Sequence, residues 1–393
     1  MKKIIDLGMH PFADTFISKE QLQLSEPVYP LQCLLDTETY EIKLAVSTSA
    51  DKRYNLYDYS YTSANSNFSR NHWDKYSEEV SKKAGLRKDS KIIEIGSNDG
   101  YLSKNFKSLG YDVVGVDSSR TMCNIAESLG IKTFNVVFDT KTSKHIKECF
   151  GKADLIVANN VFNHANDTTD FLLGVKSLLK PAGVFVFELP YWRNTIKDEK
   201  FDQIYHEHVT YFTVKYSYEL LKSADMEIFD IDIVNYHGGS IRVYASNSKD
   251  SGINKKVEDL IRQEEELGLF DPKMYQDFMK KITYKRNKFM KKIYDLKSKG
   301  FPIIGVGAAA KANTFLNFYN IDHTIMDFIT DASDSKKGKY TPLTRIPIVG
   351  DEVFADYDRV YAVILSWNIS DPLKNKIKKI NNKVIFLPPE ELL

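Results

Sequence analysis

Short apolar runs alternate with helix-length amphipathic segments through the middle of the chain, from Ser90 to about residue 248. Runs of this length, bounded by turn residues and separated by helical segments, are typical of buried strands in a parallel sheet. The runs are KIIEIG, VVGVD, KTFNVV, ADLIVANN and GVFVFELP, followed by a final pair, EIFDIDIVN and SIRVYASN. Helices are expected at DFLLGVKSLLK and SYELLKSADM. The pattern predicts an α/β fold with a central Rossmann-like domain over residues 86–248.

The regions on either side carry different patterns. Residues 1–85 are rich in tyrosine and asparagine, with alternating runs such as YEIKLAVS, and predict a small β-containing lobe. Residues 249–299 predict a helical connector, one long packing helix with apolar positions spaced by three, four and seven residues. These positions are Phe278, Ile282, Phe289, Ile293 and Leu296. Residues 300–393 return to the strand-turn-helix pattern in FPIIGVGAAAKANTFLNFY and predict a second Rossmann-like α/β domain.

Composition narrows the functional class. The chain has 393 residues and a formal net charge of +1, which gives no basic footprint for nucleic acid. No window is apolar over the length of a membrane span, and the start, MKKIIDLGMHPF, holds an apolar run too short for a signal peptide. Three cysteines lie far apart and form no C-x-x-C pair, which fits a reducing compartment. We expect a cytoplasmic protein without nucleic-acid or membrane partners; a monomer is the default, and the oligomeric state stays open.

A glycine-bracketed turn follows the first strand of the central domain. In IIEIGSNDGYLSKNFKSLGYDVVGVD, Gly96 and Gly100 allow a ligand to approach the backbone, and Asp117 follows where a carboxylate can accept both ribose hydroxyls. Dinucleotide enzymes use G-x-G-x-x-G here, whereas this chain has E-x-G-x-x-x-G with a carboxylate at Asp99 that would repel a pyrophosphate. An acidic, hydroxyl-rich loop suits a cationic ligand that carries an amino acid. The alternative is a tight first turn of any doubly wound domain.

A polar cluster, Tyr205-His206-Glu207-His208, follows the fifth strand. It supplies a base, a carboxylate that can orient an imidazole, and donors for a developing oxyanion. In a doubly wound sheet, a segment after a late strand lies at the carboxyl edge, beside the cofactor. Two alternatives stay open. One is a zinc site, since His-x-His can bind zinc although no cysteine or second histidine pair is near; the other is a structural cluster.

The C-terminal domain has its own glycine turn, Gly305-x-Gly307-Ala308-x-x-Lys311, between a strand and a helix. Close packing of helix on strand explains such glycines about as well as an anion-binding turn does. Lys311 in the first helical turn favours a phosphate slightly.

These motifs together resemble a known enzyme family. Glu94 to Gly100 is similar to the first motif of class I S-adenosylmethionine methyltransferases. The full set resembles the nucleotide-sugar C-methyltransferases that act on dTDP-linked 4-keto-deoxysugars, and it covers nearly the whole chain. It consists of EIGSNDGYL, ANNVFNHAND, FDQIYHEHVTYF, HGGSIRVYA and GVGAAAKANTFLNF with GKYTPLTRIPIV. The resemblance implies S-adenosylmethionine as cofactor, a nucleotide-sugar small-molecule substrate, and C-methylation through an enolate.

The resemblance also implies roles for single residues. His208 is expected as the base, with Glu207 orienting or stabilising its imidazolium. Tyr205 and His206 are expected to donate to the ketone or enolate oxygen, and Tyr61 to reach the substrate. Further substrate contacts are expected from Tyr59, Tyr191 and Lys311. Cofactor contacts are expected from Glu94, Gly96, Ser97, Asn98, Gly100, Asp117, Ser118, Asn159, Asn160 and His164. An asparagine pair capping a turn is an equally ordinary use of positions 159 and 160.

One departure from the family concerns metal. Family members bind a structural zinc through cysteines of the N-terminal lobe, whereas this lobe has only Cys33, so we predict no metal. Two other activities stay open. The first is an O- or N-methyltransferase that acts on a sugar hydroxyl or amine, with His208 as general base. The second is an NAD- or nucleotide-binding protein with two Rossmann-like domains.

Overall fold

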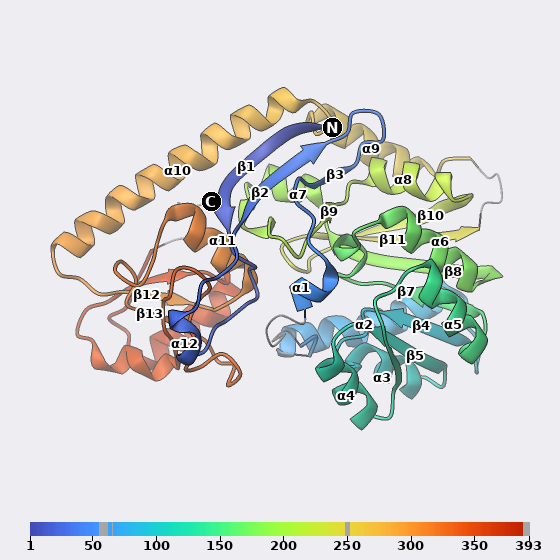
Figure 1. Cartoon of the computed structure of the whole chain (residues 1–393), viewed down its shortest axis with the longest axis horizontal. Helices are drawn as coiled ribbons and strands as arrows, with labels where there is room; N and C mark the ends of the chain where they lie inside the picture. The colour runs from blue at the N-terminus through green and yellow to red at the C-terminus, as the bar shows by residue number, and fades with distance from the viewer. Residues whose placement is uncertain (55–61, 65, 248–251, 388–393) are drawn as a thin grey trace.

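Three β-sheets form the framework of the protein (Figure 1). The fold comes from a computed structural model, which describes residues 1–54, 62–64, 66–247 and 252–387. A four-stranded sheet belongs mainly to the N-terminal segment, a seven-stranded sheet occupies the middle of the chain, and a five-stranded sheet lies in the C-terminal part.

The seven-stranded sheet is the predicted Rossmann-like core, and its strand order is β10-β11-β8-β7-β4-β5-β6. The five strands from β4 to β8 are parallel, and β11 runs antiparallel between β8 and β10. The strands are β4 (Lys91–Ile95), β5 (Asp112–Asp117), β6 (Lys132–Asn135), β7 (Ala153–Val157), β8 (Leu179–Pro190), β10 (Met226–Val234) and β11 (Ser240–Asn247). Every strand predicted from the apolar runs is present, so the α/β fold class is confirmed.

Helices cover both faces of this sheet because strand side chains alternate in direction. Ile92 of β4 packs with side chains of α2 (Asn67–Lys83) and α3 (Tyr101–Ser108). Its neighbour Ile93 packs in a second core with α5, α6 and α8. The remaining helical segments of this unit are α4 (Arg120–Ser128), α5 (Thr140–Phe150), η2 (Phe162–His164), α6 (Thr168–Leu178), α7 (Trp192–Lys197), η3 (Phe201–Gln203) and α8 (Val214–Ser223).

The N-terminal sheet takes its last strand from far along the chain. Its order is β1 (Lys2–His10), β2 (Tyr29–Leu35), β3 (Ile42–Leu44) and β9 (Thr210–Tyr211). Strand β9 begins two residues after His208 and pairs antiparallel with β3. The short helices η1 (Glu20–Gln23) and α1 (Ala50–Tyr54) complete this region. The polar motif is therefore tied directly to the N-terminal sheet.

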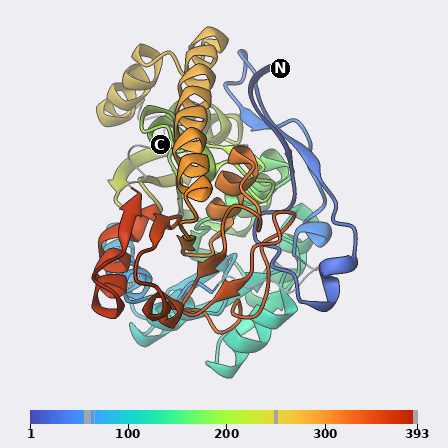
Figure 2. The same cartoon turned by 90° about the vertical axis from the view of Figure 1, so that its left-hand side faces the viewer.

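The connector consists of two helices, α9 (Lys255–Glu266) and α10 (Pro272–Ser298), and the prediction of one long helix was wrong. Gly268 adopts a φ of +78°, Asp271 caps the backbone N–H of Lys273, and Pro272 occupies the first turn of α10. The predicted apolar positions of α10 are buried, and the helix packs on β1. Figure 2 shows α10 standing above the C-terminal sheet.

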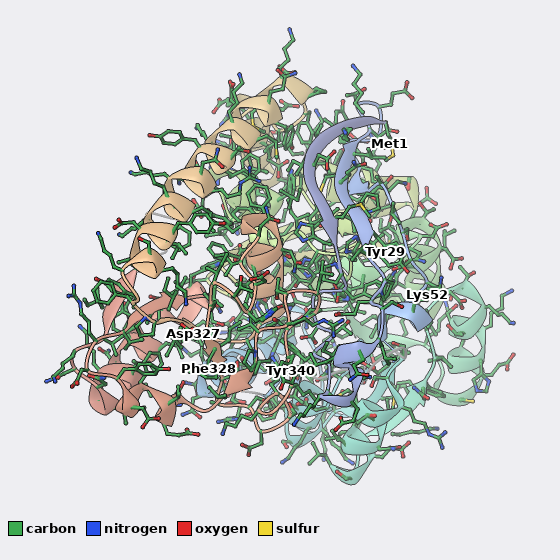
Figure 3. All side chains as sticks on the ribbon, turned by 60° about the vertical axis from the view of Figure 1, so that its left-hand side comes forward. Met1, Tyr29, Lys52, Asp327, Phe328 and Tyr340 are labelled. Atoms are coloured by element: carbon green, nitrogen blue, oxygen red, sulfur yellow. The ribbon has the colours of Figure 1, made fainter. Side chains whose placement is uncertain are left out.

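The C-terminal unit is a second Rossmann-like layer structure, as predicted. Its sheet order is β14-β13-β12-β15-β16, with every pair parallel. The elements are β12 (Ile303–Val306), α11 (Ala310–Tyr319), β13 (Phe328–Thr330), β14 (Ile348–Val349), η4 (Asp351–Asp356), β15 (Tyr361–Ile364), η5 (Trp367–Ile369), α12 (Ser370–Ile380) and β16 (Ile385–Leu387). Tyr340, labelled in Figure 3, forms a two-hydrogen-bond bridge with Ile17, which joins this unit to the N-terminal region.

Candidate active site

A pocket of about 490 Å³ lies at the carboxyl edge of the central sheet. The ends of β4, β5 and β7 form its floor, and residues of the N-terminal segment, including Ser49 and Arg53, close one side. Most of the predicted cofactor contacts line it, namely Glu94, Gly96, Ser97, Asn98, Asp117, Ser118, Asn159, Asn160 and His164. The structure thus brings together all the predicted cofactor contacts except Gly100, which does not line the pocket.

The two glycines of the first turn serve different purposes. Gly96 has a φ of +72°, and a Cβ there would lie 2.6 Å from the Cβ of Val161 in the pocket wall. Gly100 precedes α3, and a Cβ there would lie 2.8 Å from the Cβ of Ala126 in α4. Gly96 therefore shapes the pocket, whereas Gly100 allows two helices to pack.

Asp117 holds the turn in place. Its two carboxylate oxygens accept the backbone N–H groups of Asn98, at 2.9 Å, and Ser119, at 2.8 Å. Each oxygen keeps a second lone pair, so the carboxylate can still accept a hydroxyl from a ligand. Burial raises the pKa of Asp117, and this effect outweighs the lowering of the pKa by the two hydrogen bonds.

Asp99 does not face the pocket, so the reading of this carboxylate as a partner of a cationic ligand does not hold. It accepts the hydroxyl of Ser63, the backbone N–H of Ala64 at 3.2 Å and that of Tyr101 at 3.2 Å. Asn98 also accepts the N–H of Ser63 through its side chain, at 2.9 Å. The turn thus binds the N-terminal segment as well as shaping the pocket.

Unpaired polar atoms inside the pocket indicate that a ligand belongs there. The Ser97 hydroxyl and the Asn159 amide nitrogen are buried without a hydrogen-bond partner among the described residues. Tyr76 holds the Asn159 amide in place by donating to its oxygen at 2.9 Å. The wall also carries several acidic side chains, Glu94, Asp117, Asp139, Asp167 and Asp170, of which Glu94 has its pKa raised to about 8 by burial. This set of donors and acids fits a nucleoside that carries a positive charge and an amino-acid tail.

His208 lies beside this pocket in a fixed protonation state. Its Nδ1 donates to the backbone carbonyl of Gln203 at 3.0 Å, so the proton sits on Nδ1 and the Nε2 lone pair is available. Burial lowers the pKa of His208 to about 4, which keeps the ring neutral near pH 7. The Tyr205 ring lies 3.9 Å from the His208 ring, and the pocket-lining His164 ring lies 5.2 Å from it.

The other two residues of the motif face the N-terminal segment. Glu207 accepts the backbone N–H of Asp14 at 3.0 Å, and its pKa rises to about 7 because it is buried. His206 bonds the carbonyl of Pro11 at 3.3 Å and packs edge-on against Phe12. The proton position in His208 is set by the Gln203 carbonyl, which corrects the expectation that Glu207 orients this ring. The surroundings of His206 give no support to its expected role as a donor to the substrate.

Arg53 of α1 connects the N-terminal segment to the pocket. Its guanidinium donates to the carbonyl of His164 at 2.9 Å and to the side chain of Asn166 at 2.9 Å. Burial lowers the pKa of His164, and the positive charge of Arg53 lowers it further. His164 therefore stays neutral next to His208.

Of the predicted substrate contacts, Tyr191 and Lys311 lie in different surroundings. Tyr59 and Tyr61 fall outside the described residues. Tyr191 is buried, and its hydroxyl donates to Glu264 at 2.8 Å, a position that a substrate does not reach without rearrangement. Lys311 lies in the first turn of α11, donates to the side chain of Asn368 and lies 4.7 Å from the centre of the Trp367 ring. Burial lowers the pKa of Lys311 to about 8, against the opposing effect of Asp202.

Several residues near His208 carried no recognisable sequence signal. Gln203 and Asp202 precede the motif, but nothing in their spacing indicates that one binds the His208 ring and the other binds Trp367 at 2.6 Å. The HGGS segment was noted only as part of a resemblance, yet the carbonyl of His237 accepts the Gln203 side chain. Arg53 lies in a segment without a motif.

Within the described part of the chain, no three His, Cys, Asp or Glu side chains are grouped so as to hold a metal ion. Cys33 is buried in β2. Among the same residues, no helix is both long enough and apolar enough to cross a membrane.

Comparison with known proteins adds to this geometry. A family model described as a methyltransferase domain matches residues 68–230, and one described as a C-methyltransferase C-terminal domain matches residues 235–388. The C-methyltransferase NovU of Streptomyces niveus is 27% identical over 388 residues, covering 98% of this chain and 92% of NovU. A ubiquinone biosynthesis O-methyltransferase of Rhodopseudomonas palustris (strain BisA53) is 28% identical over 114 residues, 29% of this chain and 44% of that protein.

Among solved structures, magnesium protoporphyrin IX methyltransferase from Synechocystis PCC 6803 with bound S-adenosylmethionine is 14% identical, with a TM-score of 0.35. The match covers 46% of this chain and 79% of that one.

The sheet, the pocket and the matched domains define a class I S-adenosylmethionine-dependent methyltransferase, with S-adenosylmethionine as its cofactor. The likeness to NovU over nearly the whole chain, together with the matched C-terminal domain, places the protein more particularly among the C-methyltransferases.

Proposed function

We propose that the protein methylates a carbon next to the ketone of a nucleotide-linked keto-sugar, with His208 as the base. The observation that carries this proposal is the fixed Nδ1–H of His208, which leaves a lone pair on Nε2 beside the cofactor pocket. A methyltransferase that acts on a carbon acid needs such a base, because the C–H group is too weak an acid to ionise unaided.

The residues around His208 suit the proton transfer. His208 Nε2 takes the proton, the C–H electron pair forms the new C–C double bond, and the carbonyl electron pair moves onto oxygen. Tyr205 is in ring contact with His208, which supports a role as hydrogen-bond donor to that enolate oxygen. When bound, S-adenosylmethionine supplies an electrophilic methyl group for the resulting carbon nucleophile and leaves as S-adenosylhomocysteine.

Two lysines beside the Trp367 ring suit the nucleotide part of the substrate. Lys200 lies 5.1 Å and Lys311 4.7 Å from the centre of the Trp367 ring. Lys200 also donates to the carbonyl of Gly238 at 2.7 Å. Two cations beside a partly buried indole offer charge for a diphosphate and an aromatic ring against which a base can pack.

Deuterium exchange tests the role of His208. With S-adenosylhomocysteine bound and a dTDP-linked 4-keto-deoxysugar in D₂O, the wild-type protein should exchange the proton next to the ketone. His208→Asn should slow exchange and methyl transfer by at least about a thousandfold, because the proton has no acceptor. Calorimetry should find the affinity for S-adenosylhomocysteine unchanged within about twofold.

The matched control is Tyr205→Phe, which removes the donor and keeps the ring beside His208. It should slow transfer less than His208→Asn does, by about tenfold. Methyl transfer by the wild-type protein without any exchange at carbon would contradict C-methylation and favour an oxygen or nitrogen acceptor.

A further inference from the structure

A single turn of chain, residues 201–204, holds the proposed base. Its Gln203 carbonyl accepts the Nδ1–H of His208 at 3.0 Å. The Gln203 side chain is itself fixed, since it accepts the Thr195 hydroxyl at 2.8 Å and donates to the carbonyl of His237. The position of that carbonyl therefore decides both the direction of the His208 ring and which nitrogen carries the proton.

The C-terminal unit also contacts the 201–204 turn. The Trp367 indole N–H donates to Asp202 at 2.6 Å, and the Thr314 hydroxyl of α11 donates to the carbonyl of Ile204 at 3.0 Å. The Phe201 ring lies 4.8 Å from the Phe318 ring of α11. Each residue of the turn other than Gln203 thus has a partner in the C-terminal unit.

Trp367 also packs against Gly238, which follows the residue that Gln203 binds. A Cβ on Gly238 would lie 2.3 Å from the Trp367 ring. The indole therefore contacts the turn through Asp202 and the HGG segment through Gly238. Movement of the C-terminal unit cannot leave the turn unchanged, because all of these groups are buried or partly buried in close packing.

We propose that Asp202, Trp367 and Thr314 are positioning residues, through which the C-terminal unit sets the orientation and the tautomer of His208. The inference rests on the proposed role of His208 as the base. If the turn shifts, the Gln203 carbonyl moves away and the Nδ1–H loses its acceptor. The ring is then free to rotate or to carry its proton on Nε2, where it cannot act as a base. Misplacement of a catalytic group by about 1 Å can cost about a hundredfold in rate.

Trp367→Phe tests this proposal because it keeps an aromatic ring and removes the N–H donor. We expect kcat to fall about tenfold while the affinity for S-adenosylhomocysteine stays within about twofold. The decisive readout is the ¹⁵N spectrum of histidine-labelled protein. The wild type should show His208 as the Nδ1–H tautomer, and the variant should show a mixed population. Asp202→Asn, whose amide oxygen can still accept the indole N–H, should restore most of the wild-type behaviour relative to Asp202→Ala.

Thr314→Val is a second, isosteric test on the same turn, which keeps the proposal falsifiable if Trp367→Phe folds poorly. Lys336→Met is the matched control, since the Lys336 amine donates to the carbonyl of Ala308 at 2.7 Å and lies 4.9 Å from the Phe16 ring, and neither partner belongs to the 201–204 turn. The control should leave the His208 tautomer unchanged. Wild-type kcat and tautomer in both Trp367→Phe and Thr314→Val would overturn the inference. Full activity of His208→Asn would instead overturn the proposed function, and the two failures are thereby separable.

Discussion

The two Rossmann-like units of the protein use the same device to hold their first turn. In the central unit, Asp117 at the end of β5 accepts the N–H groups of Asn98 and Ser119 at 2.9 and 2.8 Å. In the C-terminal unit, Asp331 after β13 accepts the N–H groups of Ala308 and Ser333, both at 2.8 Å. In each unit, a carboxylate after the second strand ties the turn after the first strand.

The surroundings of the two turns differ completely. The central turn opens on the pocket of about 490 Å³. In the C-terminal unit, a Cβ on Gly307 would lie 2.2 Å from the Ser366 hydroxyl, and Lys336 donates to the Ala308 carbonyl at 2.7 Å. Close packing accounts for the second pair of glycines. A glycine turn with a following carboxylate therefore identifies a Rossmann-like unit, and only the space in front of it identifies a ligand site.

Replacing the two carboxylates should separate ligand binding from support of the turn. Asp117→Ala should weaken S-adenosylhomocysteine binding about a thousandfold, because the ligand loses an acceptor and the turn loses its tie. Asp331→Ala should lower the melting temperature and leave that affinity within about twofold. Calorimetry and thermal unfolding measure both. Equal losses of affinity in the two variants would contradict the conclusion that only the central turn forms a ligand site.

Lowering the pH should destabilise the central unit, because His208 is buried there in its neutral form. A pKa lowered from 6.5 to about 4 means that the unfolded chain binds more protons between these values, so stability falls as pH drops through this window. The loss from His208 amounts to about 3 kcal/mol at pH 4. His208→Asn should therefore lose less stability than the wild type between pH 6.5 and 4, as measured by urea unfolding. Parallel curves for the two proteins would contradict the buried neutral state.

Asp99→Asn should have the smallest effect. The change weakens the hydrogen bonds to Ser63 and Ala64 but leaves the turn tied by Asp117. We expect S-adenosylhomocysteine to bind about threefold more weakly. Stopped-flow measurement should place the change mainly in the dissociation rate. A loss as large as that of Asp117→Ala would mean that Asp99 supports the pocket directly.

The sequence predicted the features that depend on local pattern. Apolar runs located each strand of the central sheet, and spacing located the glycine turn and Asp117 in the pocket wall. The break between α9 and α10 is not part of the prediction although Asp271 and Pro272 mark a helix start, because the apolar positions that predict the helix all lie in α10.

The missed features depend on contacts between distant segments. Glu207 accepts the backbone N–H of Asp14, and Asp202 accepts the indole N–H of Trp367. No local spacing in the sequence encodes pairs this far apart. His206 packs against the N-terminal segment, whereas His208 lies beside the pocket. Both are histidines of one short motif, so the sequence alone could not tell which of them lies beside the pocket. Tyr191 is expected to contact the substrate, but its hydroxyl donates to Glu264 of α9, and the packing of α9 on this residue is not encoded in the local sequence.

The return of the chain to the N-terminal sheet at β9 has a consequence for synthesis on the ribosome. Strand β3 cannot complete its pairing until residues 210–211 have emerged, and the apolar face of β1 is not covered until α10 follows. At about 5–20 residues per second, β9 and α10 emerge tens of seconds after β1, β2 and β3. During that interval Ile5 and Leu7 are exposed on a strand edge, so the nascent N-terminal segment is the part of this protein most in need of a chaperone.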